Sequence, residues 1–185
     1  MFGLFRKKPK HGDDALALYS SAVRQARQPV FYEQLGVADT PDGRFDMIML
    51  HVYLILRRLK EESGEAKGLA QALFDMMFAD MDQNLREMGA GDIGVAHRIK
   101  DMAKAFYGRI AAYDEGLADL SGATLADALV RNLYRKTEPE PAQVETMEGY
   151  LRQQASALAA QPLEAFLRGD VDFGNAPQVE GGGNE

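Results

Sequence analysis

Apolar side chains recur at three- and four-residue steps through two long segments, and this spacing constrains the fold more than any other feature. In residues 65–88 the apolar stripe consists of Phe74, Met77, Phe78, Met81, Leu85 and Met88. From residue 92 onward a second stripe consists of Ile99, Met102, Ala103, Phe106, Ile110, Tyr113 and Leu117. Such steps place side chains on one face of an α-helix, whereas a half-buried strand alternates polar and apolar residues. Each segment therefore predicts an amphipathic helix.

The segment 44–62 predicts a central helix, because it is apolar on nearly all sides before Arg57 and contains no Gly or Pro. A buried strand over residues 47–56 is the alternative, but the length of the segment and its Met and Leu content favour a helix. The sequence DTPDG at 39–43 is typical of a turn. Further helices are predicted over residues 13–28, 121–136, 138–160 and 161–170, with a short apolar segment at 30–36.

The predicted fold class is all-α, a single compact domain of about six to seven helices over residues 13–173. The 185 residues and the 46% apolar content suffice for one sizeable core. Residues 1–12 are predicted to form a flexible basic N-terminus, and residues 174–185 a disordered tail. Asp92 and Thr124 are expected to be the N-cap residues of their helices.

Composition excludes several classes of protein. The formal net charge of -7 argues against bulk nucleic-acid binding. The absence of Cys rules out disulfides, iron–sulfur clusters and thiolate zinc sites. Residues 1–10 lack the apolar core of a secretory signal, and the longest apolar run, 47–56, is about half of the roughly 20 residues that a membrane span needs. We therefore expect a soluble protein in a reducing compartment.

The hexapeptide GAGDIG at 89–94 matches G-x-G-x-x-G, the fingerprint of a dinucleotide-binding turn. That turn connects a strand to a helix, but here the preceding residues have a helical period. Asp114, at the spacing of a ribose-binding acid, falls on the same predicted helix as Gly94. We therefore interpret Gly89 as the end of one helix, Gly91 as a loosening of the corner and Gly94 as a point of close helix packing. No nucleotide binding is expected.

Other candidate metal-binding and catalytic motifs also lack the residues or the spacing that they require. The first positions of a calcium-binding loop are matched by Asp80, Asp82 and Asn84. The sixth and twelfth positions of that loop require Gly and Glu, but here they are Leu85 and Gly91. The three His residues have no His partner one helical turn away. No Ser stands in a nucleophile elbow, and no P-loop lysine exists. We therefore expect neither an enzyme nor a bound metal or cofactor.

Charged residues cluster unevenly along the predicted helices, with basic residues at 57–60, acidic residues at 79–87 and basic residues among two aromatics at 97–109. The clusters are either ordinary helix surfaces matched to the helix dipoles or a bipolar docking surface. Arg57 and Arg58 point about 100° apart on a helix. We expect one of them to cover the core or to pair with an acid of 79–87, while the other faces outward.

Three blocks follow one another at residues 43–60, 73–95 and 104–117: GRFDMIMLHVYLILRRLK, LFDMMFADMDQNLREMGAGDIGV and KAFYGRIAAYDEGL. Their order and spacing, above all DMDQNLREMGAGD followed by AFYGR, resemble the ubiquinol–cytochrome c chaperone family, the bacterial counterpart of the mitochondrial cytochrome b assembly factors. The resemblance covers about residues 30–135. It implies a non-enzymatic assembly chaperone for the cytochrome bc1 (ubiquinol–cytochrome c reductase) complex that binds nascent or immature cytochrome b.

The resemblance also implies partners and a location. Mitochondrial members act with a small partner protein near the ribosomal exit and hold newly made cytochrome b until haem is inserted, so a small partner protein and the ribosome are further candidate partners. Residues 1–10, MFGLFRKKPK, are either a frayed terminus or a contact with an anionic membrane or ribosomal RNA. We expect a cytoplasmic protein, peripheral at the cytoplasmic face of the inner membrane.

The blocks that carry the resemblance supply the candidate partner-binding residues. These are Arg44, His51, Arg57, Arg58, Asp82, Arg86, Glu87, Asp92, Arg98, Tyr107, Arg109 and Tyr113. Several of them could instead form salt bridges at helix corners. The alternative function is a haem- or quinone-handling protein, because helical bundles house such ligands and Met and His serve as axial ligands. Nothing pairs His51 with a second ligand at helical spacing, so the chaperone remains the main prediction.

Overall fold

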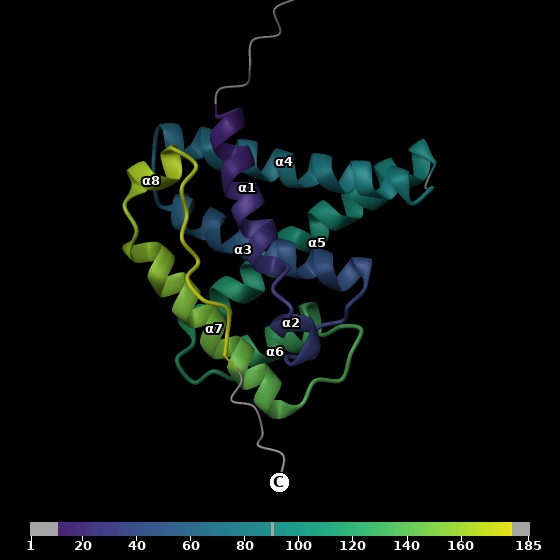
Figure 1. The fold of residues 1–185 in the computed structure, drawn as a ribbon, viewed down its shortest axis with the longest axis vertical. Coiled ribbons are helices and arrows are strands. Elements are labelled where there is room, and N and C mark those ends of the chain that lie inside the picture. Colours follow the sequence, from purple (N-terminus) through teal and green to yellow (C-terminus); the bar gives the residue numbers. More distant parts are fainter. Residues whose placement is uncertain (1–10, 90, 179–185) are drawn as a thin grey trace, which may run out of the picture.

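The computed structural model describes residues 11–89 and 91–178, which form helices joined by loops (Figure 1). The helices are α1 (Gly12–Ala26), α2 (Val30–Glu33), α3 (Pro41–Lys60), α4 (Glu65–Glu87), α5 (Asp92–Ala118), α6 (Ala123–Asn132), α7 (Pro141–Ala160) and α8 (Leu163–Leu167). Six of them have ten or more residues, whereas α2 and α8 have only four and five. No strand occurs in the described ranges, so the all-α prediction is confirmed.

Helix α3 forms the centre of the fold (Figure 1). Every residue from 47 to 55 is buried, because α1, α4 and α7 pack around this helix. A helix without a solvent-facing stripe needs neighbours on most sides, and the apolar run in the sequence predicted that arrangement. Other large buried side chains from α1, α2, α5, α7 and α8 complete a single core around α3.

The beginning of α3 differs from the prediction, because residues 39–43 start a helix and do not form a separate turn. Thr40 Oγ1 accepts a hydrogen bond from the Gly43 N–H at 3.2 Å, and Pro41 occupies the first turn, where a missing N–H costs nothing. Gly43 is required, since a Cβ there would overlap the carbonyl group of Ala38. Residues typical of turns therefore cap the central helix.

Helices α4 and α5 form a hairpin whose joined ends project from the rest of the molecule (Figure 1). Gly89 follows the end of α4 with φ of +86°, as its interpretation as a helix-ending residue predicted. Asp92 is not the N-cap of α5, because Gly91 holds that position and Asp92 is the first helical residue. The predicted close packing at Gly94 is also wrong, since no atom lies within 4 Å of where its Cβ would be. The glycine motif thus follows α4 and runs into the first turn of α5, and a helix precedes it where a dinucleotide fingerprint requires a strand.

The C-terminal third closes the fold with α6, α7 and α8. Thr124 is not the N-cap of α6, because Gly122 precedes the helix and the Asp119 carboxylate accepts a hydrogen bond from the Thr124 N–H at 3.2 Å. After α8 the chain returns along α7, and Phe173 is buried there (Figure 1). Residues 174–178 have no regular structure. The predicted basic N-terminus at residues 1–10 and the part of the predicted tail at 179–185 lie outside the described residues.

Candidate docking groove

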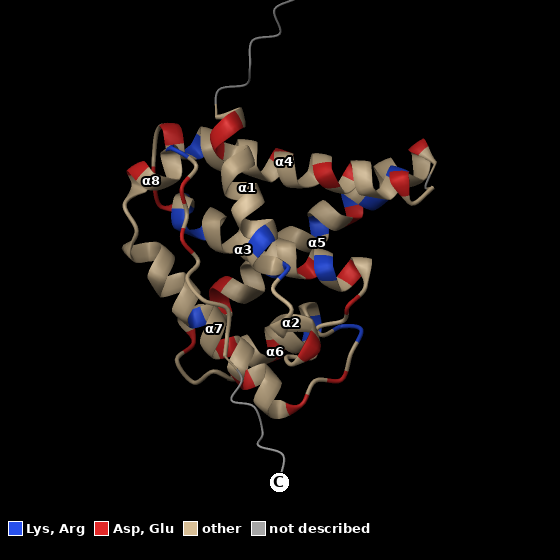
Figure 2. Ribbon diagram, viewed as in Figure 1, with Lys and Arg blue, Asp and Glu red and all other residues tan. Residues whose placement is uncertain are grey.

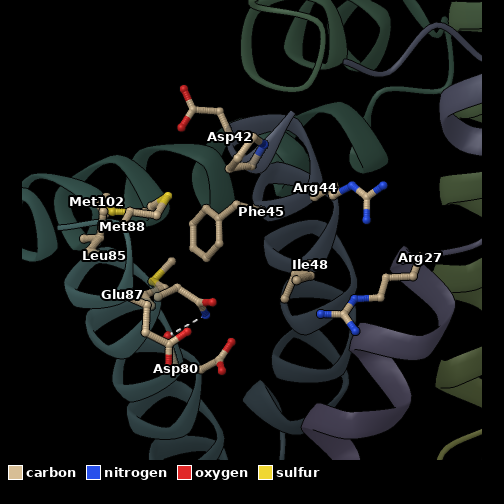
Figure 3. Close-up of a pocket in the computed structure, with 13 residues that line it drawn as sticks. Arg27, Asp42, Arg44, Phe45, Ile48, Asp80, Leu85, Glu87, Met88 and Met102 are labelled. Atoms are coloured by element: carbon tan, nitrogen blue, oxygen red, sulfur yellow. Dashed lines mark hydrogen bonds between the residues drawn. The ribbon is translucent and has the colours of Figure 1, made fainter. Parts of the chain in front are cut away.

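A groove of about 390 Å³ opens between the first turns of α3, the C-terminal half of α4, the middle of α5 and the end of α1 (Figure 3). We call it the docking groove. Its apolar surface consists of Phe45, Ile48, Met81, Leu85, Met88 and Met102. Asp80 and Glu87 lie on the α4 side, whereas Arg27 and Arg44 lie on the side of α1 and α3. Asp42 also lies on the α3 side, so the groove combines an apolar floor with a rim that carries both signs of charge.

The floor of the docking groove continues the apolar stripe of α4 beyond the core. Met81 and Leu85 are buried, but Met88, the next member of the stripe, has 60% of its surface exposed. Methionine side chains are flexible and polarizable, and they are common on surfaces that adapt to different apolar partners. Three of the six apolar lining residues are methionines. This composition suits an apolar segment of another molecule.

Most charged groups on the walls have partners within the protein. The Asp80 carboxylate accepts a hydrogen bond from the Tyr19 hydroxyl at 2.7 Å, and burial followed by this bond raises the pKa of Tyr19 far above its usual value. Arg44 forms an ion pair with Asp39 at 2.6 Å and lies over the Tyr32 ring. Burial raises the pKa of Tyr32 to about 12. The walls are therefore largely ordered before any partner binds.

A buried ion-pair network ties the first turns of α3, which line the groove, to other parts of the fold. The Asp46 side chain, 2% exposed, accepts hydrogen bonds from Arg109 Nη1 at 2.6 Å and from Arg135 Nε at 2.8 Å. These bonds tie α3 to α5 and to the loop after α6. Arg109, predicted as a partner contact, is only 13% exposed and serves this network. Sequence reasoning missed Asp46, although an acid within an apolar helical run signals a buried pair.

His51, another predicted contact, lies in the core with no exposed surface. Its Nδ1 donates to the Met47 carbonyl oxygen at 2.8 Å, and its Nε2 accepts from the Tyr150 hydroxyl at 2.8 Å. Burial lowers the pKa of His51 to about 4, which matches a neutral ring in this arrangement. Both ring nitrogens are engaged, so an axial bond to haem would break one of these hydrogen bonds. The geometry disfavours the haem-handling alternative.

Arg57 and Arg58 pair with acids other than those expected. Arg57 Nε lies 3.6 Å from an Asp114 oxygen on α5, and Arg58 donates to Glu62, just after the end of α3, at 2.7 Å. Arg58 also donates to the Gln161 carbonyl oxygen at 3.2 Å. Neither arginine has an ion pair with an acid of residues 79–87 in the described part of the chain. Arg58 fits the other expected alternative, covering the core, because its side chain is 14% exposed and its guanidinium lies over the buried Phe166 ring at 5.6 Å. Arg58 instead connects α3 to the chain between α7 and α8.

The projecting end of the α4–α5 hairpin carries the remaining charged candidates (Figure 2). Arg86 pairs with Asp82 at 2.6 Å and also with Asp92, so it bridges the two helices across the glycine corner. These bonds, led by the one from Asp82, raise the pKa of Arg86 above its usual value. Glu87 accepts a hydrogen bond from the Gln83 side chain at 2.9 Å, and Arg98 is exposed.

The two predicted tyrosines differ in exposure. Tyr107 is 61% exposed and packs its ring against Phe74 at a centroid distance of 5.6 Å. Tyr113 is buried against Tyr53, and burial raises its pKa above the usual value. Of the twelve predicted residues, only Arg44 and Glu87 line the docking groove. Arg27, Phe45 and the methionines were missed, because lining a groove depends on how four helices meet.

Searches of the described residues for other kinds of site give two negative results. No group of three or more His, Cys, Asp or Glu side chains in residues 11–89 and 91–178 has a geometry that could hold a metal ion. Within the same residues, no helix combines the length and hydropathy that crossing a bilayer requires.

Comparison with known proteins gives consistent matches. A model of the ubiquinol-cytochrome C chaperone family matches residues 33–173. The chain is 31% identical over 153 residues to ubiquinol-cytochrome-c reductase complex assembly factor 1 of Xenopus laevis, which covers 83% of this chain and 76% of that protein. It is 32% identical over 168 residues to the corresponding factor of Mus musculus, covering 90% of this chain but only 56% of the mouse protein.

A solved structure agrees with these matches. The crystal structure of the Cbp3 homolog from Brucella abortus has a TM-score of 0.81 and 38% identity, covering 92% of this chain and 93% of that one. The fold and the docking groove thus define an all-helical protein with an apolar surface groove. The chain belongs to the ubiquinol-cytochrome C chaperone family. The family region extends to residue 173, well beyond the resemblance seen in residues 30–135.

Proposed function

We propose that this protein is an assembly chaperone for the cytochrome bc1 complex and that its client, the polypeptide it holds, is newly made cytochrome b. The observation that carries the proposal is the family match over residues 33–173, whose relatives are named as assembly factors for ubiquinol-cytochrome c reductase. The groove geometry supports a holding role, because an apolar floor beside charged walls can cover an apolar client segment.

The mechanism is binding without chemistry. The docking groove covers the client, and the exposed charged residues around it set the orientation of the client and the rate at which it is captured. Among the predicted contacts this role falls to the charged residues with exposed surface, namely Arg44, Asp82, Arg86, Glu87, Asp92 and Arg98. The exposed ring of Tyr107 adds an aromatic contact. His51, Arg109 and Tyr113 have little or no exposed surface, so they make their contacts within the protein.

The chaperone acts at the cytoplasmic face of the inner membrane in this proposal, where cytochrome b enters the bilayer. Peripheral contact would come from residues 1–10, whose basic and apolar side chains suit an anionic lipid surface. A small partner protein and the ribosome are further proposed partners, by analogy with the mitochondrial members of the family.

A deletion strain complemented with groove variants tests the function. Loss of the protein should lower assembled bc1 complex and leave other respiratory complexes largely intact. Met88→Asp, which puts a charge on the groove floor, should reduce co-purification of cytochrome b. Leu120→Asp is the matched control, because Leu120 is 93% exposed but lies outside the groove. Normal bc1 levels in the deletion strain would refute the function.

A further inference from the structure

A second hollow extends the docking groove along α1. It measures about 520 Å³ and shares Arg27 and Asp80 with the groove, so the two join at these residues. Its other lining residues are on α1 or, for Arg27, directly after it: Leu16, Tyr19, Ser20, Val23, Arg24 and Arg27. They recur at helical spacing, and the distance from Leu16 to Arg27 along α1 is about 16 Å at 1.5 Å per residue. The combined surface, which we call the trough, is long and suits an elongated occupant better than a compact ligand.

The two ends of the trough are apolar and open. Leu16 at one end is 50% exposed, and Met88 at the other is 60% exposed. Large exposed apolar side chains joined by a continuous hollow are typical of a binding surface. The trough is made of helices and offers no strand edge in the described residues. A segment that lies in it must therefore satisfy its own backbone hydrogen bonds, which favours an α-helix.

A basic side chain at the junction of the two hollows favours an occupant with an acidic group. Arg27 is exposed there, and its guanidinium forms no hydrogen bond or ion pair with the residues that the structure describes. The neighbouring acid, Asp80, is held by Tyr19, and Asp39 is held by Arg44. A carboxylate on the occupant would complete the pairing of Arg27.

We propose that the client segment seated in this trough is an amphipathic helix whose apolar face lies between Leu16 and Met88 and whose edge places a carboxylate against Arg27. This inference rests on the proposed function for the identity of the client and adds the chemistry of the segment. A charge pair bordered by apolar side chains discriminates between partners, because the wrong charge meets either no partner or repulsion.

Synthetic helical peptides test this recognition directly on the full-length protein. Three labelled peptides share one Leu- and Phe-rich face and differ at one edge position, which is Glu, Gln or Lys. We expect fluorescence anisotropy to show about tenfold tighter binding of the Glu peptide than of the Gln peptide. Arg27→Gln should remove this preference, and Arg27→Glu should shift it to the Lys peptide. Equal binding of all three peptides by the natural protein would overturn the inference.

Two controls keep the result specific. Arg131→Gln removes an exposed arginine of α6, outside the trough, and should leave the preference intact. Thermal unfolding of Arg27→Gln should stay close to that of the natural protein, because the Arg27 guanidinium forms no hydrogen bond or ion pair with the described residues. A preference lost equally in Arg131→Gln would point to general charge and overturn the inference.

The N-terminal segment of the same chain is the competing occupant. Replacing Phe2 and Phe5 by Ser in the full chain should leave peptide affinity unchanged. Tighter peptide binding by that variant would show that residues 1–10 occupy the trough and would overturn our assignment. This outcome can be told apart from a failure of the proposed function. If the peptide preference is missing but the deletion strain has impaired bc1 assembly, only the inference is refuted. If the deletion strain assembles the bc1 complex normally, the proposed function is refuted.

Discussion

Replacing Asp46 by Ala should destabilise the protein more than any exposed ion-pair substitution. Asp46 is the shared acceptor of Arg109 and Arg135, and its side chain is 2% exposed. Its removal leaves the guanidinium of Arg109, 13% exposed, in the interior without a counter-ion. Breaking a buried pair in this way costs about 3–5 kcal/mol, whereas an exposed pair contributes at most about 1 kcal/mol.

The assay is thermal and urea unfolding of Asp46→Ala beside Asp82→Ala, which removes a partner of the exposed Arg86. For a domain of this size about 1 kcal/mol shifts the Tm by roughly 2–4 °C, so Asp46→Ala should lower it by about 6 °C or more. The second substitution in Asp46→Ala/Arg109→Met should recover part of the loss, because it removes the stranded charge. A loss from Asp46→Ala no greater than that from Asp82→Ala would refute the account of the network.

Three further outcomes follow from single features. Gly108→Ala should raise the free energy of unfolding by about 0.5–1 kcal/mol, because Gly108 lies inside α5 with open space where a Cβ would be. Denaturant titration measures this change, and a lower free energy of unfolding would contradict the prediction. The pKa of His51 is lowered from 6.5 to about 4, so the unfolded chain binds more protons between these values and stability should fall as the pH drops through that window. A His51→Asn variant should lack this part of the pH dependence, and an unchanged profile would contradict it. Haem added to the protein should give no sharp Soret shift in a visible spectrum, because both nitrogens of His51 are already hydrogen-bonded.

The difference between the expected and the observed helix ends has a local cause. Apolar periodicity predicts where a helix exists, but which residue begins it depends on which polar group reaches the free N–H groups. At α3, Thr40 accepts a hydrogen bond from the Gly43 N–H, so a sequence typical of a turn caps the helix. At α6 the carboxylate of Asp119 reaches the Thr124 N–H from the preceding loop. In each case the predicted and the observed way of starting the helix are both compatible with the same short sequence.

The sequence by itself determined the helical class, the central position of residues 47–55 and the failure of the glycine fingerprint, because these depend on local period and on the element that precedes a motif. It also carried the family resemblance. Only the tertiary structure decided the partners of Asp46, which lie 63 and 89 residues away, and the joining of α1, α3, α4 and α5 around the docking groove. Helix crossing determines which distant side chains meet, and periodicity within a helix carries no information about that crossing.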